Sequence, residues 1–185
     1  MTYMFNNAFE FEQDLSSWDV SQVLFFTGMF QNATSFTGSG ISAWEILRGT
    51  NLSFMFANAR RFNANLSSWS VARVTSFRSM FSGAASFVGT GLASWDMTRA
   101  RDTAFMFANT ATFNEDLSPW DVRNIGNFDG MFEGASGFAQ DLCAWGLLLR
   151  SDASVIDMFA ETACVVTDDP DLTAAIPGPF CAACS

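Results

Sequence analysis

Large apolar residues return along the chain at a nearly constant interval. The dipeptide Met-Phe recurs with spacings of 25, 26, 25, 26, 25 and 27 residues, from Met4-Phe5 to Met158-Phe159. One tryptophan falls in each of the first six intervals, and a Leu or Ile stands three residues before it. A fixed period of this length is the signature of a repeat architecture. The chain is therefore predicted to consist of about six stacked copies of one unit.

Within a repeat, the pattern predicts two kinds of element. Residues 18–20 alternate apolar and polar, as a short strand does. A helix is indicated by an apolar residue every three or four positions, as at Val23, Phe26, Met29 and Ala33. One such unit cannot bury its own apolar face, but stacked copies can. The expected fold class is an α/β repeat solenoid, leucine-rich-repeat-like, with short parallel strands on one face and short helices on the other.

The interval alternates because one loop alternates in length. Four residues lead from Phe11 to Leu15, but five lead from Phe36 to Ile41, and the longer loop is rich in glycine. Glycine in a loop suggests backbone with a positive φ. The repeating unit is thus predicted to be a pair of repeats, 51 residues long.

The C-terminal part of the chain differs from the repeats. We expect residues 1–160 to form the repeats and residues 161–185 to form a cap that contains Cys and Pro, because the end of a solenoid exposes its core. All the cysteines lie near this end, at Cys143, Cys164, Cys181 and Cys184. The favoured interpretation is one or two disulfides that hold the cap on the last repeat, with the pairing left open. The alternative is a four-thiolate zinc or iron–sulfur site.

Two stretches resemble a known family. Residues 11–23 read Phe-Glu-Gln-Asp-Leu-Ser-Ser-Trp-Asp-Val-Ser-Gln-Val, and residues 113–122 read Phe-Asn-Glu-Asp-Leu-Ser-Pro-Trp-Asp-Val. Both run on to Met-Phe, and the pattern resembles the repeats of BspA-like proteins from residue 4 to about residue 160. That family occurs in bacterial surface proteins and in algal genomes. The resemblance implies a leucine-rich-repeat-like solenoid with a role in adhesion or protein–protein contact.

Composition argues against several classes of function. The chain has no His and no Lys, so the usual general base near neutral pH and any Schiff-base lysine are missing. We therefore expect a protein that is not an enzyme and has no cofactor. A formal net charge of −10 argues against binding to nucleic acid. No apolar run reaches the roughly 18 residues of a membrane span, so we expect no transmembrane segment.

An acidic residue follows most of the tryptophans. The series is Asp19, Glu45, Asp96 and Asp121, and Ser70 and Gly146 interrupt it. If the tryptophans point inward, these acids point outward and offer a strip for a basic protein partner, or for calcium between paired carboxylates. The favoured interpretation is local: each acid caps the helix that follows it.

These features predict a non-enzymatic adhesion or protein–protein interaction protein, secreted or displayed at the cell surface, with an unknown protein partner. Disulfides would place it in an oxidising location, either extracellular or, alternatively, an organelle lumen. The alternative function is a structural linker or scaffold subunit within a large complex, such as an organellar photosynthetic membrane complex. Met1 and Met4 already lie inside a repeat, so we expect further sequence or a neighbouring protein to cover that end.

Overall fold

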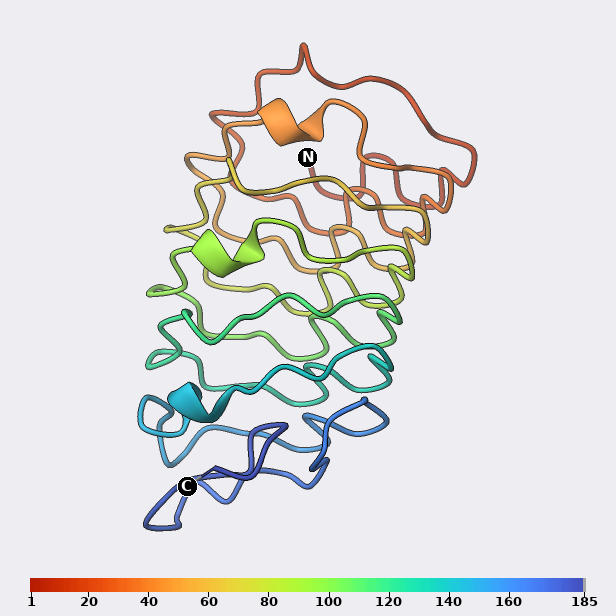
Figure 1. Ribbon diagram of the computed structural model, residues 1–185. Helices are drawn as coiled ribbons and strands as arrows, with labels where there is room; N and C mark the ends of the chain where they lie inside the picture. Colours follow the sequence, from red (N-terminus) through yellow and green to blue (C-terminus); the bar gives the residue numbers. More distant parts are fainter. Residues whose placement is uncertain (185) are drawn as a thin grey trace.

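Residues 1–184, which the computed structural model describes, form a stack of similar rungs with the two chain ends at opposite ends of the stack (Figure 1). Isolated parallel β-bridges join each rung to the next, with one residue from each rung. The bridging residues are Phe25, Asn51, Ser76, Asp102, Asn127 and Ser154. The period of 25 to 27 residues in the sequence is therefore the length of one rung.

The predicted α/β leucine-rich-repeat-like solenoid is wrong. Residues 1–184 contain neither a strand nor an α-helix. Their only helical elements are three 3-10 helices of 3 residues each: η1 (Ile41–Ala43), η2 (Leu92–Ser94) and η3 (Cys143–Trp145). Single bridges between rungs stand where short parallel strands were expected, and tight turns stand where short helices were expected.

The segment predicted as a helix is a run of tight turns. Gly28 and Asn32 adopt the left-handed conformation, with φ of +59° and +61°, and a right-handed helix cannot continue through such residues. The amides of Met29 and Ala33 each donate to the carbonyl three residues earlier, at 3.0 Å. Apolar residues recur every three or four positions because the turns do. The spacing therefore imitates the periodicity of a helix.

Alternate amides of this segment donate to the next rung. Those of Phe26, Gly28, Phe30 and Asn32 donate to carbonyls one rung later, at 3.0, 2.9, 2.8 and 2.7 Å. The same alternation recurs in the later rungs. Backbone groups that a helix would pair internally are paired between rungs instead, and so remain satisfied.

The segment predicted as a strand is bent by two local hydrogen bonds. The carboxylate of Asp19 accepts one from the amide of Ser21 at 2.9 Å, which forms an Asx turn. The amide of Val23 donates to the carbonyl of Val20 at 2.9 Å. In the described chain, no backbone hydrogen bond of residues 18–20 reaches another rung, so this segment cannot act as a strand.

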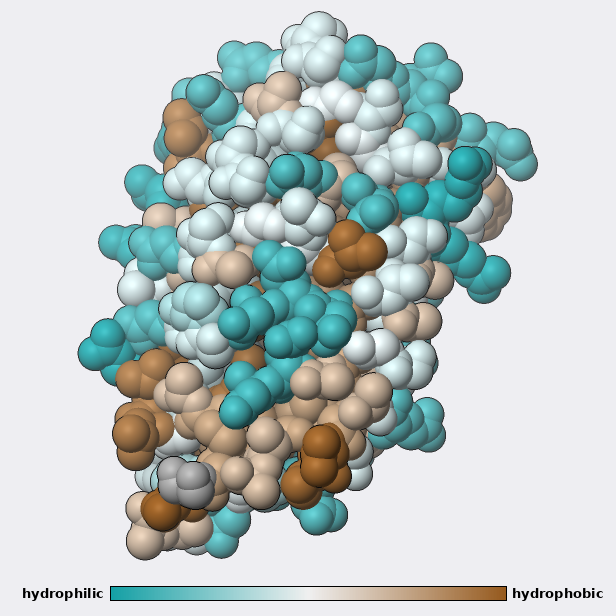
Figure 2. Space-filling model, in the orientation of Figure 1, coloured by the Kyte–Doolittle hydropathy of each residue, from teal (hydrophilic) through white to brown (hydrophobic). Residues whose placement is uncertain are grey.

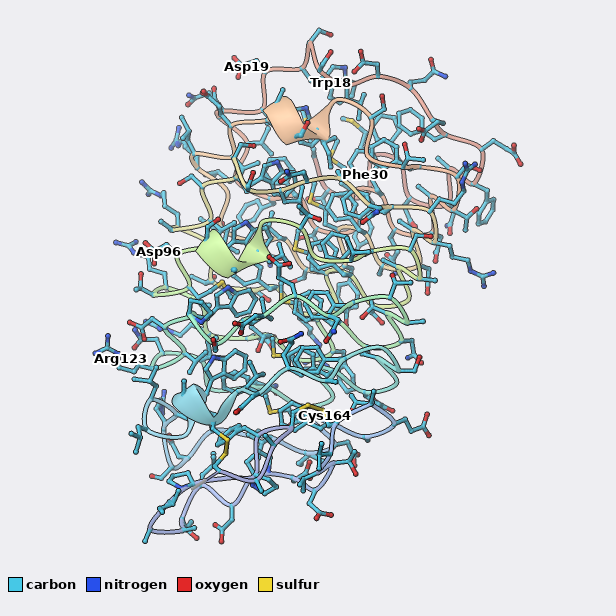
Figure 3. The ribbon with its side chains drawn as sticks, viewed as in Figure 1. Trp18, Asp19, Phe30, Asp96, Arg123 and Cys164 are labelled. Atoms are coloured by element: carbon cyan, nitrogen blue, oxygen red, sulfur yellow. A yellow bond between two sulfur atoms is a disulfide. The ribbon has the colours of Figure 1, made fainter. Side chains whose placement is uncertain are left out.

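Aromatic columns fill the interior along the stack (Figure 3). The fully buried rings of Phe30 and Phe56, one rung apart, have centroids 5.6 Å apart and planes within 4°. A second phenylalanine column packs beside the first, with Phe56 and Phe62 at 3.9 Å. Indole N–H groups bond to the preceding rung, as from Trp69 to the carbonyl of Ile41 at 2.9 Å. The columns thus combine burial of apolar surface with satisfied indole donors.

Rungs with a long loop differ from their neighbours. Gly40 and Gly91, with φ of +82° and +92°, immediately precede η1 and η2. A Cβ atom on Gly91 would lie 2.5 Å from the amide nitrogen of Ser67 in the preceding rung, so only glycine fits. A short-loop rung instead uses a side chain to reach the long-loop rung that follows it, since Asn63 accepts a hydrogen bond from the amide of Val88 at 3.1 Å. The predicted pairing of repeats therefore has a structural basis.

Residues 165–184, which we call the tail, follow the last rung and fold against the C-terminal end of the stack (Figure 1). Phe180 is fully buried, and its carbonyl accepts a hydrogen bond from the amide of Leu142 at 3.1 Å. Two disulfides tie the tail to the rungs, Cys143–Cys184 and Cys164–Cys181. The tail therefore contributes both an apolar side chain and covalent links to the last rungs.

Replacing Gly91 by alanine tests the close approach of the loops. We expect Gly91→Ala to lower the free energy of unfolding by about 2–4 kcal/mol, because the new Cβ meets backbone and the φ is left-handed. Gly126→Ala is the matched control, since its Cβ would have no neighbour closer than 4.0 Å, and it should change stability by less than about 0.5 kcal/mol. Chemical denaturation measures both. Equal stability of the two variants would contradict the packing described.

Candidate interaction surface

Charged side chains form two columns along one edge of the stack. The first column holds the predicted acids, and the second lies three residues later in the repeat. Figure 3 shows Asp19, Asp96 and Arg123 along this edge. We call it the charged edge, and it comprises Asp19, Glu45, Asp96 and Asp121 with Arg48, Arg73 and Arg99.

The acids point outward because the tryptophans before them point inward. Trp44, Trp95 and Trp120 are buried. Glu45 and Asp96, which follow two of them, are exposed, and Asp121 is partly exposed. The structure thus places all four predicted acids at equivalent outward positions, with Ser70 interrupting the column.

Three of the acids have a local structural role. Asp19, Asp96 and Asp121 each accept a hydrogen bond from the amide two residues later, at 2.9, 3.0 and 3.2 Å. No helix follows them, so the expected capping of a helix is wrong; each acid stabilises an Asx turn instead. Glu45 makes no side-chain hydrogen bond within the described chain. Its carboxylate is free to meet another molecule.

Local hydrogen bonds lower the pKa of Asp19, Asp96 and Asp121. Hydrogen bonds from the hydroxyl and then the amide of Thr98 lower the pKa of Asp96. Asp121 receives two bonds from the Arg123 guanidinium, at 2.9 and 2.7 Å, which lower its pKa and raise that of Arg123. The pKa of Asp19 is lowered by hydrogen bonds from Ser21. These carboxylates are therefore negative at neutral pH.

The arginines of the charged edge are exposed and lack acidic partners. Among residues 1–184 the ion pairs are Arg78–Asp102, Arg123–Asp121 and Arg150–Asp152. Arg48 donates to the side chain of Gln22 at 3.0 Å, and Arg73 and Arg99 form no ion pair in the described chain. Like charges at equivalent positions of adjacent rungs repel. In a chain with 19 acidic residues, these three stacked cations form no ion pair within the described residues, and the charge of Arg99 acts on Asp96 only to lower its pKa.

The arginine column was not predicted from the sequence. Its signal is present in the repeat register, because the position three residues after each acid, or after Ser70, reads Gln22, Arg48, Arg73, Arg99 and Asn124 down the stack. The net charge of the chain does not reveal this column, because a negative total does not say where the few cations lie.

The structure also bears on the candidate metal site, on a membrane span and on the cysteines. The four cysteines are paired in disulfides and so present no thiolate set for a metal. No group of three or more Cys, Asp or Glu side chains suited to a metal ion occurs in residues 1–184. Over the same residues, no helix has the length and apolar character needed to cross a membrane. Two disulfides are typical of a protein in an oxidising environment.

Fold and surface together define a tandem-repeat protein of stacked rungs with an aromatic interior and a charged edge. A family model described as "Mycoplasma protein of unknown function, DUF285" matches residues 1–95 and 50–169. The chain belongs to this family. No curated protein and no solved structure matches the chain.

The pairing of Asp121 with Arg123 gives a pH prediction. Because the folded state lowers the pKa of Asp121, its contribution to stability is present above the unfolded value of about 3.9 and is lost as pH falls through the folded value. In Arg123→Gln we expect the pKa of Asp121 to rise toward its ordinary value. The variant should therefore lose less stability than the unmodified protein when the pH falls. Carboxyl-detected NMR titration measures the pKa. Arg73→Gln serves as the control, and an Asp121 pKa that is equally low in both variants would disprove the assignment.

Proposed function

We propose that this protein is a non-enzymatic interaction or adhesion protein that binds a protein partner through the charged edge. The observation that carries the proposal is the column of Arg48, Arg73 and Arg99, which lies exposed without ion pairs beside a column of acids. Uncompensated like charges weaken a folded protein slightly. A partner that supplies carboxylates opposite the arginines would turn this cost into binding energy.

The chemistry of the edge indicates the kind of partner it fits. Arginine binds carboxylates through two parallel hydrogen bonds, and the acids beside it favour cations. A protein surface with both signs of charge in matching columns is therefore a better partner than a uniformly charged polymer. Such complementarity raises association rates and specificity, and it weakens as salt increases.

Three further observations support a binding role outside the reducing cytosol. The chain has neither His nor Lys, so the commonest catalytic bases are missing. The repeats resemble those of BspA-like proteins, which include bacterial surface proteins. With two disulfides, this favours a secreted or surface-displayed protein, or alternatively one in an oxidising organelle lumen.

Comparative affinity capture tests the proposal. Immobilised protein is exposed to an extract of its native source, and captured partners are quantified by mass spectrometry at low and at high salt. We expect Arg73→Gln/Arg99→Gln to reduce capture of the main partner at least about tenfold, which corresponds to 1.4 kcal/mol. Arg60→Gln/Arg61→Gln is the matched control, because it removes the same charge from a different part of the rung, beside Phe62.

Two outcomes would contradict the proposal. One is equal capture by the two double variants, which would show that the charged edge is not part of the binding surface. The other is the absence of any partner retained by the unmodified protein above the level of an empty support.

A linker within a larger assembly is the second candidate function. Phe5, Phe11 and Trp18 are only half-buried, whereas the equivalent rings of later rungs are fully or almost fully buried. This half-covered aromatic surface would suit end-on contact with another protein.

Sedimentation distinguishes the linker from the independent binding protein. A linker should co-sediment with a large complex in the native extract, and its purified chain should self-associate or aggregate. Behaviour as a 20.2 kDa monomer both in the extract and after purification would exclude the linker function.

A further inference from the structure

A small cavity at the C-terminal end of the stack has a disulfide in its wall. It measures about 200 Å³ and is lined by Cys143, Gly146, Leu147, Ile176, Pro177 and Cys184. Leu147 and Ile176 are 87% and 60% exposed, which gives the cavity an apolar rim open to solvent. Figure 2 shows hydrophobic residues gathered at this end of the visible face. A disulfide reached through an open apolar cavity is accessible to a thiol reagent.

The two disulfides differ in their access to solvent. Cys143 and Cys184 are both partly exposed and line the cavity. Of the other pair, Cys164 is partly exposed, but Cys181 is only 3% exposed. Because attack on a disulfide needs access to its sulfur atoms, an external thiol should react first with Cys143–Cys184.

The two disulfides are linked through a Cys-x-x-Cys sequence. Residues 181–184 read Cys-Ala-Ala-Cys, and each of these cysteines is bonded to a different partner in the rungs. A Cys-x-x-Cys pair can form a disulfide with itself, as in disulfide oxidoreductases. A third pairing, Cys181–Cys184, is therefore open to the tail once one of its existing disulfides is broken.

We propose that the cavity is a reaction site for a dithiol reductant, and that the Cys181–Cys184 pair passes a single reduction on to both disulfides. One thiolate of the reductant attacks the sulfur of Cys143, the Cys143–Cys184 bond breaks, and Cys184 leaves as a thiolate. The second thiol of the reductant then displaces Cys143 as a thiol and leaves the reductant as a cyclic disulfide. Two electrons have passed from the reductant to the protein.

The liberated Cys184 carries the exchange to the buried disulfide. Its thiolate attacks the sulfur of Cys181, a Cys181–Cys184 bond forms, and Cys164 leaves as a thiolate that takes up a proton. This second step consumes no reductant, because one disulfide replaces another. One dithiol per chain thus removes both covalent links between the tail and the rungs.

The consequence is a tail held only by noncovalent contacts. Phe180 remains packed in the core, and its carbonyl still accepts from Leu142, but neither Cys143 nor Cys164 is bonded to residues 181–184. Local opening of the tail becomes easier, and opening removes Phe180 from the core at the end of the stack. The cavity and the Cys-x-x-Cys pair together act as a redox-operated release.

Limited reduction of the full chain tests the proposal. The protein is treated with one equivalent of dithiothreitol, the free thiols are trapped with iodoacetamide, and the labelled cysteines and disulfides are mapped by mass spectrometry. We expect two labels per chain, at Cys143 and Cys164, together with a Cys181–Cys184 disulfide. Labels at Cys143 and Cys184 with Cys164–Cys181 intact would overturn the proposal. So would any other labelled pair, or a mixture of fully oxidised and fully reduced chains.

Two variants isolate the exchange step without any reductant. Cys143→Ser leaves Cys184 unpaired. The free thiol of Cys184 should then form the Cys181–Cys184 disulfide and leave Cys164 as the labelled thiol. Cys184→Ser is the matched control, which should keep Cys164–Cys181 and label Cys143 alone. Retention of Cys164–Cys181 in Cys143→Ser would show that no transfer occurs. Limited reduction of the unmodified protein remains decisive if either variant fails to fold.

Discussion

Backbone hydrogen bonds between rungs set the spacing on which the rest of this structure depends. Every second amide of residues 26–32 donates to the next rung, which places equivalent residues one above another at about 4.8 Å. Phe30 and Phe56 meet as offset, nearly parallel rings because the register leaves no other arrangement. The aromatic columns are therefore a product of the backbone ladder, and in return they exclude water from it.

This ladder needs residues that tolerate left-handed backbone. Gly28 and Asn32 supply it in one rung, and Phe54 and Asn58 occupy the same positions in the next, with φ of +60° and +58°. A left-handed Phe54 is unfavourable on its own, so the bonds on both sides of the rung must compensate for it. Asn58 adds a side-chain bond to Asn32 at 2.9 Å. Cooperation between neighbouring rungs thus stabilises what one rung could not.

The sequence predicts the repeat and its interior well, and the local backbone poorly. Period and burial follow from side-chain identity, so the buried column that contains Trp44 and Trp69 could be predicted from the sequence. The helix prediction failed because a chain of three-residue turns repeats its apolar positions at helical spacing. The recurring Asn or Gly at the position of Asn32 carried the missing signal, since these residues most readily adopt a positive φ. Disulfide pairing could not be predicted, because four cysteines allow three connectivities.

The register that stacks rings also stacks charges, and this explains much of the charged edge. The charge of Asp121 in the next rung raises the pKa of Asp96, yet the net shift of this pKa is downward. Local hydrogen bonds from Thr98 therefore outweigh repulsion between rungs. The prediction that these acids line an outward column follows from the repeat alone, whereas their engagement in Asx turns depends on a backbone bend that side-chain periodicity does not reveal. The arginines beside them form no ion pair in the described chain; Arg48 donates to Gln22, and the charge of Arg99 lowers the pKa of Asp96.

Cooperation between rungs has a weak point where the stack ends. An inner rung is held from both sides, but the last rung has a neighbour on one side alone, and fraying starts at such places. The tail answers this with Phe180 in the core and with covalent links at Cys143 and Cys164. A covalent link is the one stabilising contact whose strength depends on redox conditions. In the described chain, disulfides occur only at the end of the stack. The stability of this least cooperative part therefore depends on redox conditions, whereas that of the inner rungs does not.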